Sequence, residues 1–164
     1  MHHGIYPFVT SRDTTVAGCL ADAGIAPKRI RKVIMVCRTY PIRVGGPSGP
    51  MGIGVTYKEL SRRSGIPAKT LLKIEKTTTT GKQRRVAEFD WQQFYQSVAL
   101  NGPTDIALTF VDYISISNKQ AYRFEQLTQE TQRFVEELQR ISGVPVSMLS
   151  TDFNWRNVID RRCW

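Results

Sequence analysis

Three short apolar runs, separated by stretches with helical spacing, constrain the fold of this chain more than any other feature. The runs lie at residues 31–40, 106–113 and 144–149. The first run is nearly continuously apolar, which is typical of a strand that is covered on both faces, the second predicts another buried strand and the third a further strand. Between the second and third runs, residues 127–141 carry apolar side chains at helical spacing, and Gly143 ends the pattern. Strands that alternate with helices predict an α/β sheet.

Capping residues and glycines delimit further helices. Thr14 can cap a helix that Gly24 ends, Gly65 separates two short helices, and Asp90 is a good N-cap. Residues 45–50 are rich in glycine and proline and predict a loop. The additional helices are therefore expected at residues 14–23, 57–64, 68–76 and 91–100.

Size and composition favour one domain. The chain has 164 residues, without an internal repeat or a low-complexity linker, so we expect a single domain over residues 1–164. No apolar run approaches the roughly 18 residues of a membrane-spanning helix, and the start lacks a signal-peptide pattern. Cys19, Cys37 and Cys163 are widely separated, which indicates thiols in a reducing compartment rather than a disulfide or metal framework. The cytoplasm is the expected location.

The positive charge of the chain predicts an anionic partner or a solvated basic face. The formal net charge is +9, and basic surfaces attract the phosphates of nucleotides or of nucleic acid. Residues 56–85 hold nine Lys/Arg against two Glu. The helix pair within residues 56–76 also has the look of a helix-turn-helix, with Lys69, Thr70 and Lys73 on the exposed face. A nucleic-acid-binding function is therefore the alternative hypothesis, and a helical insert over an active site is the preferred interpretation.

Residues 77–85 read Thr-Thr-Thr-Thr-Gly-Lys-Gln-Arg-Arg and carry the strongest chemical signal. Hydroxyls, backbone N–H groups and three cations suit carboxylate or phosphate oxygens, because Arg offers a planar fork of donors and Lys a point charge. The same composition also fits a flexible basic surface loop. From the residues alone, both interpretations stay open.

Four segments in order along the chain resemble motifs of the adenylosuccinate synthetase family. Residues 79–85 are similar to its aspartate-binding loop T-T-G-R-x-R-R, with Lys82 in place of the first arginine. Residues 4–15 resemble G-T-Y-P-F/Y-V-T-S-S-N-T-T, residues 43–47 resemble R-V-G-x-G-P, and residues 150–151 resemble the start of S-T-G. The resemblance implies the C-terminal portion of a three-layer α/β sheet domain related to P-loop nucleotidases, with residues 56–76 as a helical insert.

The resemblance implies a ligase that joins L-aspartate to C6 of a 6-oxopurine nucleotide, either IMP or a guanine nucleotide, in purine nucleotide biosynthesis. GTP or ATP would activate the purine oxygen, and Mg²⁺ is expected for the full enzyme with ligands outside this chain. Transferred residue by residue, the nucleotide-binding positions are Thr10, Val44 and Arg84. The aspartate-binding positions are Thr79, Thr80, Lys82 and Arg84, and those for the triphosphate's base are Asp112, Ser150 and Asp152.

Departures from the family pattern bear on specificity. Lys82 lacks the bidentate geometry of arginine, so aspartate should be held differently. The guanine-reading T-K-L-D becomes residues 109–112, in which Phe110 replaces the lysine, and Asp152 replaces the last glycine of S-T-G. Both GTP and ATP therefore stay possible. The shortened middle resembles the divergent archaeal and viral branch of the family.

The family's phosphate loop and catalytic base are not found in this sequence. Residues 45–50 are broken by proline, and no glycine-rich strand-to-helix loop occurs elsewhere. No catalytic residue is therefore expected in this chain, which alone should be inactive because phosphate positioning and general-base catalysis are missing. A homodimer or a separately encoded N-terminal half is a possible partner, and an exposed apolar sheet edge would be its docking surface.

Overall fold

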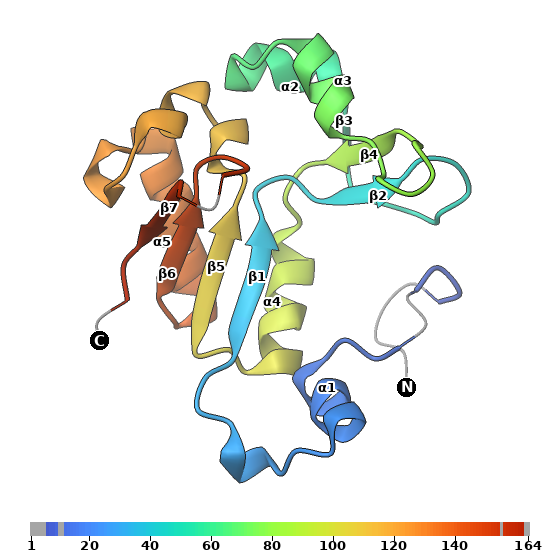
Figure 1. The fold of residues 1–164 in the computed structure, drawn as a ribbon, viewed down its shortest axis with the longest axis vertical. Helices are drawn as coiled ribbons and strands as arrows, with labels where there is room; N and C mark the ends of the chain where they lie inside the picture. Colours follow the sequence, from blue (N-terminus) through green and yellow to red (C-terminus); the bar gives the residue numbers. More distant parts are fainter. Residues whose placement is uncertain (1–5, 10–11, 155, 163–164) are drawn as a thin grey trace.

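The main sheet of the protein has four strands in the order β1-β5-β6-β7 (Figure 1). The computed structural model describes residues 6–9, 12–154 and 156–162. The first three strands are parallel and correspond to the three apolar runs, while β7 pairs antiparallel with β6 and was not expected from the sequence. The strands are β1 (Ile34–Arg38), β5 (Asp105–Thr109), β6 (Val146–Ser150) and β7 (Val158–Asp160).

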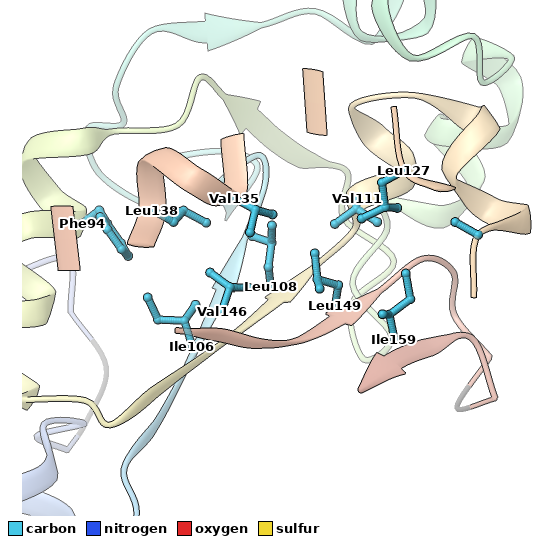
Figure 2. Packing of buried hydrophobic residues seen from close by; sticks show 11 residues of the cluster. Phe94, Ile106, Leu108, Val111, Leu127, Val135, Leu138, Val146, Leu149 and Ile159 are labelled. Carbon is cyan, nitrogen blue, oxygen red and sulfur yellow. The ribbon is translucent and has the colours of Figure 1, made fainter. Parts of the chain in front are cut away.

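Two helices build the main core against one face of this sheet. They are α4 (Trp91–Asn101) and α5 (Gln129–Ser142). Val135 and Leu138 of α5 meet Leu108 of β5 and Leu149 of β6, and all four side chains are fully buried (Figure 2). The alternation of side chains along the strands aims these residues at the helices.

The opposite face of the sheet is uncovered in the described part of the chain. Ile34 is 40% exposed, Val36 is 69% exposed and Val158 is 43% exposed. The expectation that the run at residues 31–40 is covered on both faces is therefore wrong at Ile34 and Val36. Helices pack on one face only, so β1 alternates between half-buried and exposed positions. The α/β class is confirmed, and an apolar surface at the β1 edge is present as expected.

A second, three-stranded antiparallel sheet stands at the carboxyl end of the main one. Its strand order is β2-β4-β3, and a helix pair between β3 and β4 in the chain contributes apolar side chains to its core. Leu60, Ile66 and Leu71 are buried against Val86 and Tyr113. The elements are β2 (Ile42–Val44), β3 (Gly54–Val55), β4 (Arg84–Ala87), α2 (Tyr57–Ser64) and α3 (Ala68–Ile74).

Local capping agrees with the sequence at most helix ends. The Asp90 side chain accepts a hydrogen bond from Gln93 N at 2.9 Å, and Gly143 ends α5 in the left-handed conformation. Helix α1 (Val16–Ala23) is capped by Thr15, one residue later than expected. Short 3-10 helices complete the described chain: η1 (Pro27–Arg29), η2 (Val111–Tyr113), η3 (Ile116–Gln120) and η4 (Phe124–Gln126). Among the described residues, no helix is long and apolar enough to cross a membrane.

The second apolar run changes structure before its end. Strand β5 stops at Thr109, and Phe110 adopts φ 61°, which is uncommon for a residue with a side chain. The chain then turns into η2, so Val111 and Asp112 are buried in a tight turn rather than in a strand. This turn places Asp112 at the carboxyl edge of the sheet.

Candidate functional site

The carboxyl ends of β1, β5 and β6 converge on one edge of the main sheet (Figure 1). Thr39 follows β1 and donates its hydroxyl to the carbonyl oxygen of Phe110 at 2.7 Å. The Arg38 guanidinium stacks 3.6 Å from the centroid of the Phe110 ring, and the Phe153 ring packs edge to face against Phe110, with 5.4 Å between the ring centroids. In open α/β sheets, ligands bind outside the carboxyl ends of parallel strands. This edge is therefore the candidate site.

A buried carboxylate holds two arginines at this edge. The Glu75 side chain lies directly after α3 and is fully buried. It forms an ion pair with Arg38, accepts the Tyr113 hydroxyl at 2.7 Å, and lies 3.6 Å from Arg84 Nη1. Burial and the Glu75 carboxylate raise the pKa of Tyr113, so its hydroxyl remains a donor. Two guanidinium groups against one carboxylate leave one positive charge in surplus, which favours an anionic ligand.

The predicted threonine loop is a closed turn between α3 and β4. The hydroxyls of Thr77 and Thr80 share a hydrogen bond with 2.6 Å between their oxygens, and the Lys82 backbone N–H donates to Thr77 Oγ1 at 3.0 Å. Thr79, Thr80 and Lys82 are exposed on this turn. Arg84 begins β4 immediately after it. The structure therefore brings the four predicted aspartate-binding residues together, with Arg84 the most deeply placed.

A second group of charges lies at the ends of β5 and β6. Asp112 is 5% exposed, and its Oδ1 has no hydrogen-bond partner among the described residues. Lys119 Nζ lies 3.8 Å from Asp112 Oδ2 and 3.5 Å from Asp152 Oδ1. The Ser150 hydroxyl donates to the Asp152 carbonyl oxygen at 2.8 Å. The predicted residues Asp112, Ser150 and Asp152 are thus neighbours, while Lys119 was missed from the sequence.

The pKa of Asp112 is raised from 3.8 to about 6, mainly because burial disfavours the carboxylate. Lys119 lowers this pKa and the Asp152 carboxylate raises it. A buried carboxyl group with a perturbed pKa and an unused acceptor, placed at a sheet edge, is typical of a functional site.

This raised pKa predicts how Asp112→Asn changes stability with pH. The native protein binds the Asp112 proton more tightly than the unfolded chain, so the stabilisation is fully present below about pH 4 and is lost as the pH rises through about 6. Asparagine cannot ionise. We therefore expect Asp112→Asn to be more stable than the wild type by on the order of 2 kcal/mol at pH 8, and equally stable near pH 4. Urea denaturation at both pH values measures the difference, and equal stability at pH 8 would contradict it.

A cleft of about 1100 Å³ adjoins Arg84 and is lined by β2 and by one side of α4 along its length. Val44, which is 40% exposed, lines it together with Arg43 and Phe8. Arg43 holds the cleft wall by donating to the carbonyl oxygens of Phe8 at 2.9 Å and Ser48 at 3.0 Å. Val44 and Arg84 therefore face one cleft. Thr10, the third predicted nucleotide-binding residue, lies outside the described residues.

Gly45 explains part of the motif at residues 43–47. A Cβ atom at this position would lie 2.5 Å from the carbonyl oxygen of Gln83, which accepts the Gly45 N–H at 2.8 Å. Only glycine lets the end of β2 approach the chain beside Arg84 so closely. The motif therefore brings the cleft wall against the threonine turn.

The helix pair at residues 56–76 is part of the body of the molecule rather than a separate module. Its buried leucines share a core with Tyr113 of η2 and Val86 of β4. Arg63 of α2 pairs with Glu59 and Glu88 at 2.7 and 2.6 Å, so much of its charge is neutralised. Lys69, Thr70 and Lys73 are exposed on α3, but the pair is built into the core around Tyr113 and does not form a free-standing module.

The residues of this edge do not suit a divalent cation. Lys119 already stands between Asp112 and Asp152, and an ammonium group there repels a metal ion. Within the described ranges, no group of three or more His, Cys, Asp or Glu is placed to hold a metal.

The geometry defines an α/β protein in which two guanidinium groups and the buried carboxyl group of Asp112 lie at the carboxyl edge of a parallel sheet. The chain belongs to the adenylosuccinate synthetase family, whose model matches residues 1–119. Adenylosuccinate synthetase of Methanocaldococcus jannaschii is 35% identical over 162 residues, which are 99% of this chain and 44% of that protein. The enzyme of Pyrococcus horikoshii is 34% identical over 99% of this chain and 45% of its own length.

Two solved structures share the fold. Succinoaminodeoxyadenylate synthetase of cyanophage S-2L, bound to dGMP and to dATP as an energy donor, is 26% identical with a TM-score of 0.69. It aligns with 99% of this chain and 43% of the phage protein. Fully ligated adenylosuccinate synthetase of Plasmodium falciparum has a TM-score of 0.79 at 19% identity, over 96% of this chain and 46% of that one, and supports the fold alone. The chain thus spans less than half the length of these relatives.

Proposed function

We propose that this chain supplies the aspartate- and nucleotide-binding portion of a ligase that joins L-aspartate to C6 of a 6-oxopurine nucleotide. The acceptor would be IMP or a guanine nucleotide, with hydrolysis of GTP or ATP, in purine nucleotide biosynthesis. The observation that carries the proposal is the Arg38–Glu75–Arg84 cluster, whose surplus positive charge lies at the carboxyl edge of the sheet beside Asp112.

Arg84 is proposed as the main contact to the aspartate carboxylate and to the ribose or phosphoryl oxygens next to it. Its side chain is 26% exposed and only loosely paired with Glu75 at 3.6 Å, so it can turn a planar fork of donors to a ligand. Lys82 would add a mobile point charge, and the hydroxyls of Thr79 and Thr80 would donate to the same carboxylate. Because Lys82 has no fork, the bidentate contact falls to Arg84.

The acceptor nucleotide is proposed to lie in the cleft that Val44 and Arg84 line, with Thr10 contributing from the N-terminal segment. The base of the triphosphate would lie over Asp112, Ser150 and Asp152. A buried carboxylate with an unused oxygen can accept hydrogen bonds from the edge of a purine. The Phe110 and Phe153 rings beside this pocket can stack against a base.

The remaining catalytic groups are proposed to come from another part of the full enzyme. The phosphate loop, the general base and the Mg²⁺ ligands are expected there, either in a separately encoded N-terminal half or in a longer chain. Ile34 and Val36 form an apolar surface on β1, whose outer edge pairs with no described strand. This surface suits such a partner better than solvent. A homodimer is the other arrangement that we propose.

We also propose a domain organisation and a cellular location for the chain. We interpret residues 1–164 as one domain with residues 56–76 as a helical insert, since the buried leucines of the helix pair join the core around Tyr113. The free thiols of Cys19 and Cys37 favour a reducing compartment, so the cytoplasm is the proposed location.

Calorimetric titration of the purified chain tests the proposal. The ligands are IMP, GMP, aspartate, ATP, GTP and a short duplex DNA. We expect nucleotide and aspartate binding that Arg84→Ala weakens by tenfold or more, since a charge-assisted hydrogen bond contributes about 1.5–3 kcal/mol. Arg140→Ala is the matched control, because Arg140 lies on the exposed side of α5 and pairs with Glu137. Salt-sensitive binding of DNA without a nucleotide signal would refute the proposal and support the helix-turn-helix.

A further inference from the structure

Lys119 occupies a position that the family motifs do not assign. It lies on η3, and its ammonium group stands between the carboxylates that follow β5 and β6, at 3.8 Å from Asp112 Oδ2 and 3.5 Å from Asp152 Oδ1. The Asp112 side chain is only 7% exposed, whereas those of Lys119 and Asp152 are 32% and 35% exposed. One cation therefore serves two carboxylates, one buried and one accessible.

The protonation state of a buried carboxyl group decides which purine it can recognise. A carboxylate offers only acceptors, so it matches the two N–H donors at N1 and N2 of guanine. A protonated carboxyl offers one O–H donor and one acceptor, which matches N1 and the N6 amino group of adenine. A group that controls the proton on Asp112 would therefore control the choice of base.

We propose that Lys119 is a specificity-determining residue that holds Asp112 as a carboxylate and thereby makes this pocket prefer a guanine to an adenine triphosphate. The inference rests on the proposed function, which places the base of the triphosphate over Asp112. Lys119 acts through Asp112 and is a positioning residue. Asp152 keeps Lys119 in place by accepting its ammonium at the exposed side of the pocket.

Opposing influences act on the pKa of Asp112, so the removal of one neighbouring charge can change its protonation state. Burial is the largest effect and raises its pKa, and the Asp152 carboxylate also raises it. The Lys119 ammonium and the Arg38 guanidinium lower it, and the outcome is a pKa of about 6. These are the charged groups that face Asp112 from η3, from the segment after β6 and from the end of β1. Removal of Lys119 therefore leaves burial and Asp152 opposed only by a backbone hydrogen bond and by Arg38, so we expect Asp112 to take up its proton near neutral pH.

The test compares the affinities of the full chain for GTP and ATP between pH 5.5 and 8. In the wild type, we expect the preference for GTP to fall as the pH drops through about 6. Lys119→Met keeps the length of the side chain and removes the charge. It should shift the GTP-to-ATP affinity ratio toward ATP by on the order of tenfold at pH 7, as a rise of one pKa unit would. Lys119→Arg should retain the wild-type ratio, and Asp112→Asn, which imitates the protonated group, should favour ATP at every pH.

A carbon-detected NMR titration of the Asp112 carboxyl provides a readout that does not depend on nucleotide. Its midpoint should lie near 6 in the wild type and higher in Lys119→Met. If Lys119→Met lost affinity for GTP and ATP equally, or if the titration midpoint of Asp112 were unchanged, the inference would be overturned and the proposed function would stand. A wild-type chain that binds neither nucleotide would overturn both.

Discussion

Replacing Glu75 with glutamine is expected to lower the free energy of unfolding by about 3 kcal/mol, because removal of one partner leaves a buried charge uncompensated. The Glu75 side chain is fully buried and is shared by Arg38, Arg84 and the Tyr113 hydroxyl. The Arg38 side chain is 15% exposed, so water cannot replace the lost carboxylate fully. Urea denaturation followed by circular dichroism at pH 7 measures the change.

Glu59→Gln is the matched control for this prediction. Glu59 also pairs with two arginines, Arg62 and Arg63, but on the exposed side of α2. Solvent screens such pairs, so the control should unfold at nearly the urea concentration of the wild type. If both variants lost the same stability, burial of Glu75 would not be what makes its ion pairs matter.

The second large effect is expected in the main core, where Leu108→Ala should destabilise the protein by about 2–5 kcal/mol. Leu108 is fully buried at the centre of the sheet and meets Val135, Leu138 and Leu149 (Figure 2). Truncation removes apolar burial and leaves a cavity between the sheet and α5, which the close-packed surroundings fill only in part. Chemical denaturation, with the slope of the transition checked against the wild type, gives the value.

Leu72→Ala serves as the control for Leu108→Ala, since Leu72 on α3 is 41% exposed. The same atoms are removed, but no cavity forms, and the change should stay well below that of Leu108→Ala. Similar losses in the two variants would mean that the sheet–helix cluster is not the main source of stability.

The Glu75 network also connects stability with the candidate site. The carboxylate that joins α3 to β1 and η2 is the one that holds Arg38 and Arg84 at the carboxyl edge. Arg38 in turn stacks on Phe110, beside the pocket of Asp112. A change in the helix pair should therefore disturb ligand contacts at the carboxyl edge, because Glu75 contacts Arg38 in space although the two residues are 37 positions apart in the sequence.

Elements with strong local signals could be predicted from the sequence. Asp90 caps α4 and Gly143 ends α5, as expected, because both signals depend only on neighbouring backbone groups. The two helices around Gly65 were predicted to within two residues for the same reason. The three parallel strands followed from their apolar runs.

Elements that depend on distant partners could not be predicted. Strand β4 begins inside the basic segment that was interpreted as a loop, and it exists because β2 and β3 pair with it on both sides. Strand β5 ends early because Phe110 turns into the left-handed region, which no residue pattern near it indicates. The sheet is covered on one face only because α4 and α5 both pack on that face, and local sequence patterns do not indicate this arrangement.

Only those residues of the candidate site that lie in segments resembling family motifs were predicted from the sequence. Asp112, Ser150 and Asp152 are neighbours as the resemblance implied. Glu75 and Lys119 were missed because each has a partner more than 30 residues away along the chain. Glu75 pairs with Arg38, and Lys119 pairs with Asp152. A signal for Glu75 existed: it follows Leu71 by four residues, so a carboxylate is placed on the same side as this apolar residue at the end of α3.

The most direct test of the central claim is to map ligand contacts by NMR on the isotope-labelled chain, titrated with IMP or GMP, aspartate, and GTP or ATP. If this edge of the sheet is the binding site, the backbone signals of Arg38, Arg84, Asp112 and Ser150 should shift together, while those at the opposite ends of the strands, such as Ile34 and Val146, should not. Shifts confined to the exposed side of α2 and α3, or no shifts at millimolar ligand, would contradict the claim that this edge of the sheet is a nucleotide and aspartate site.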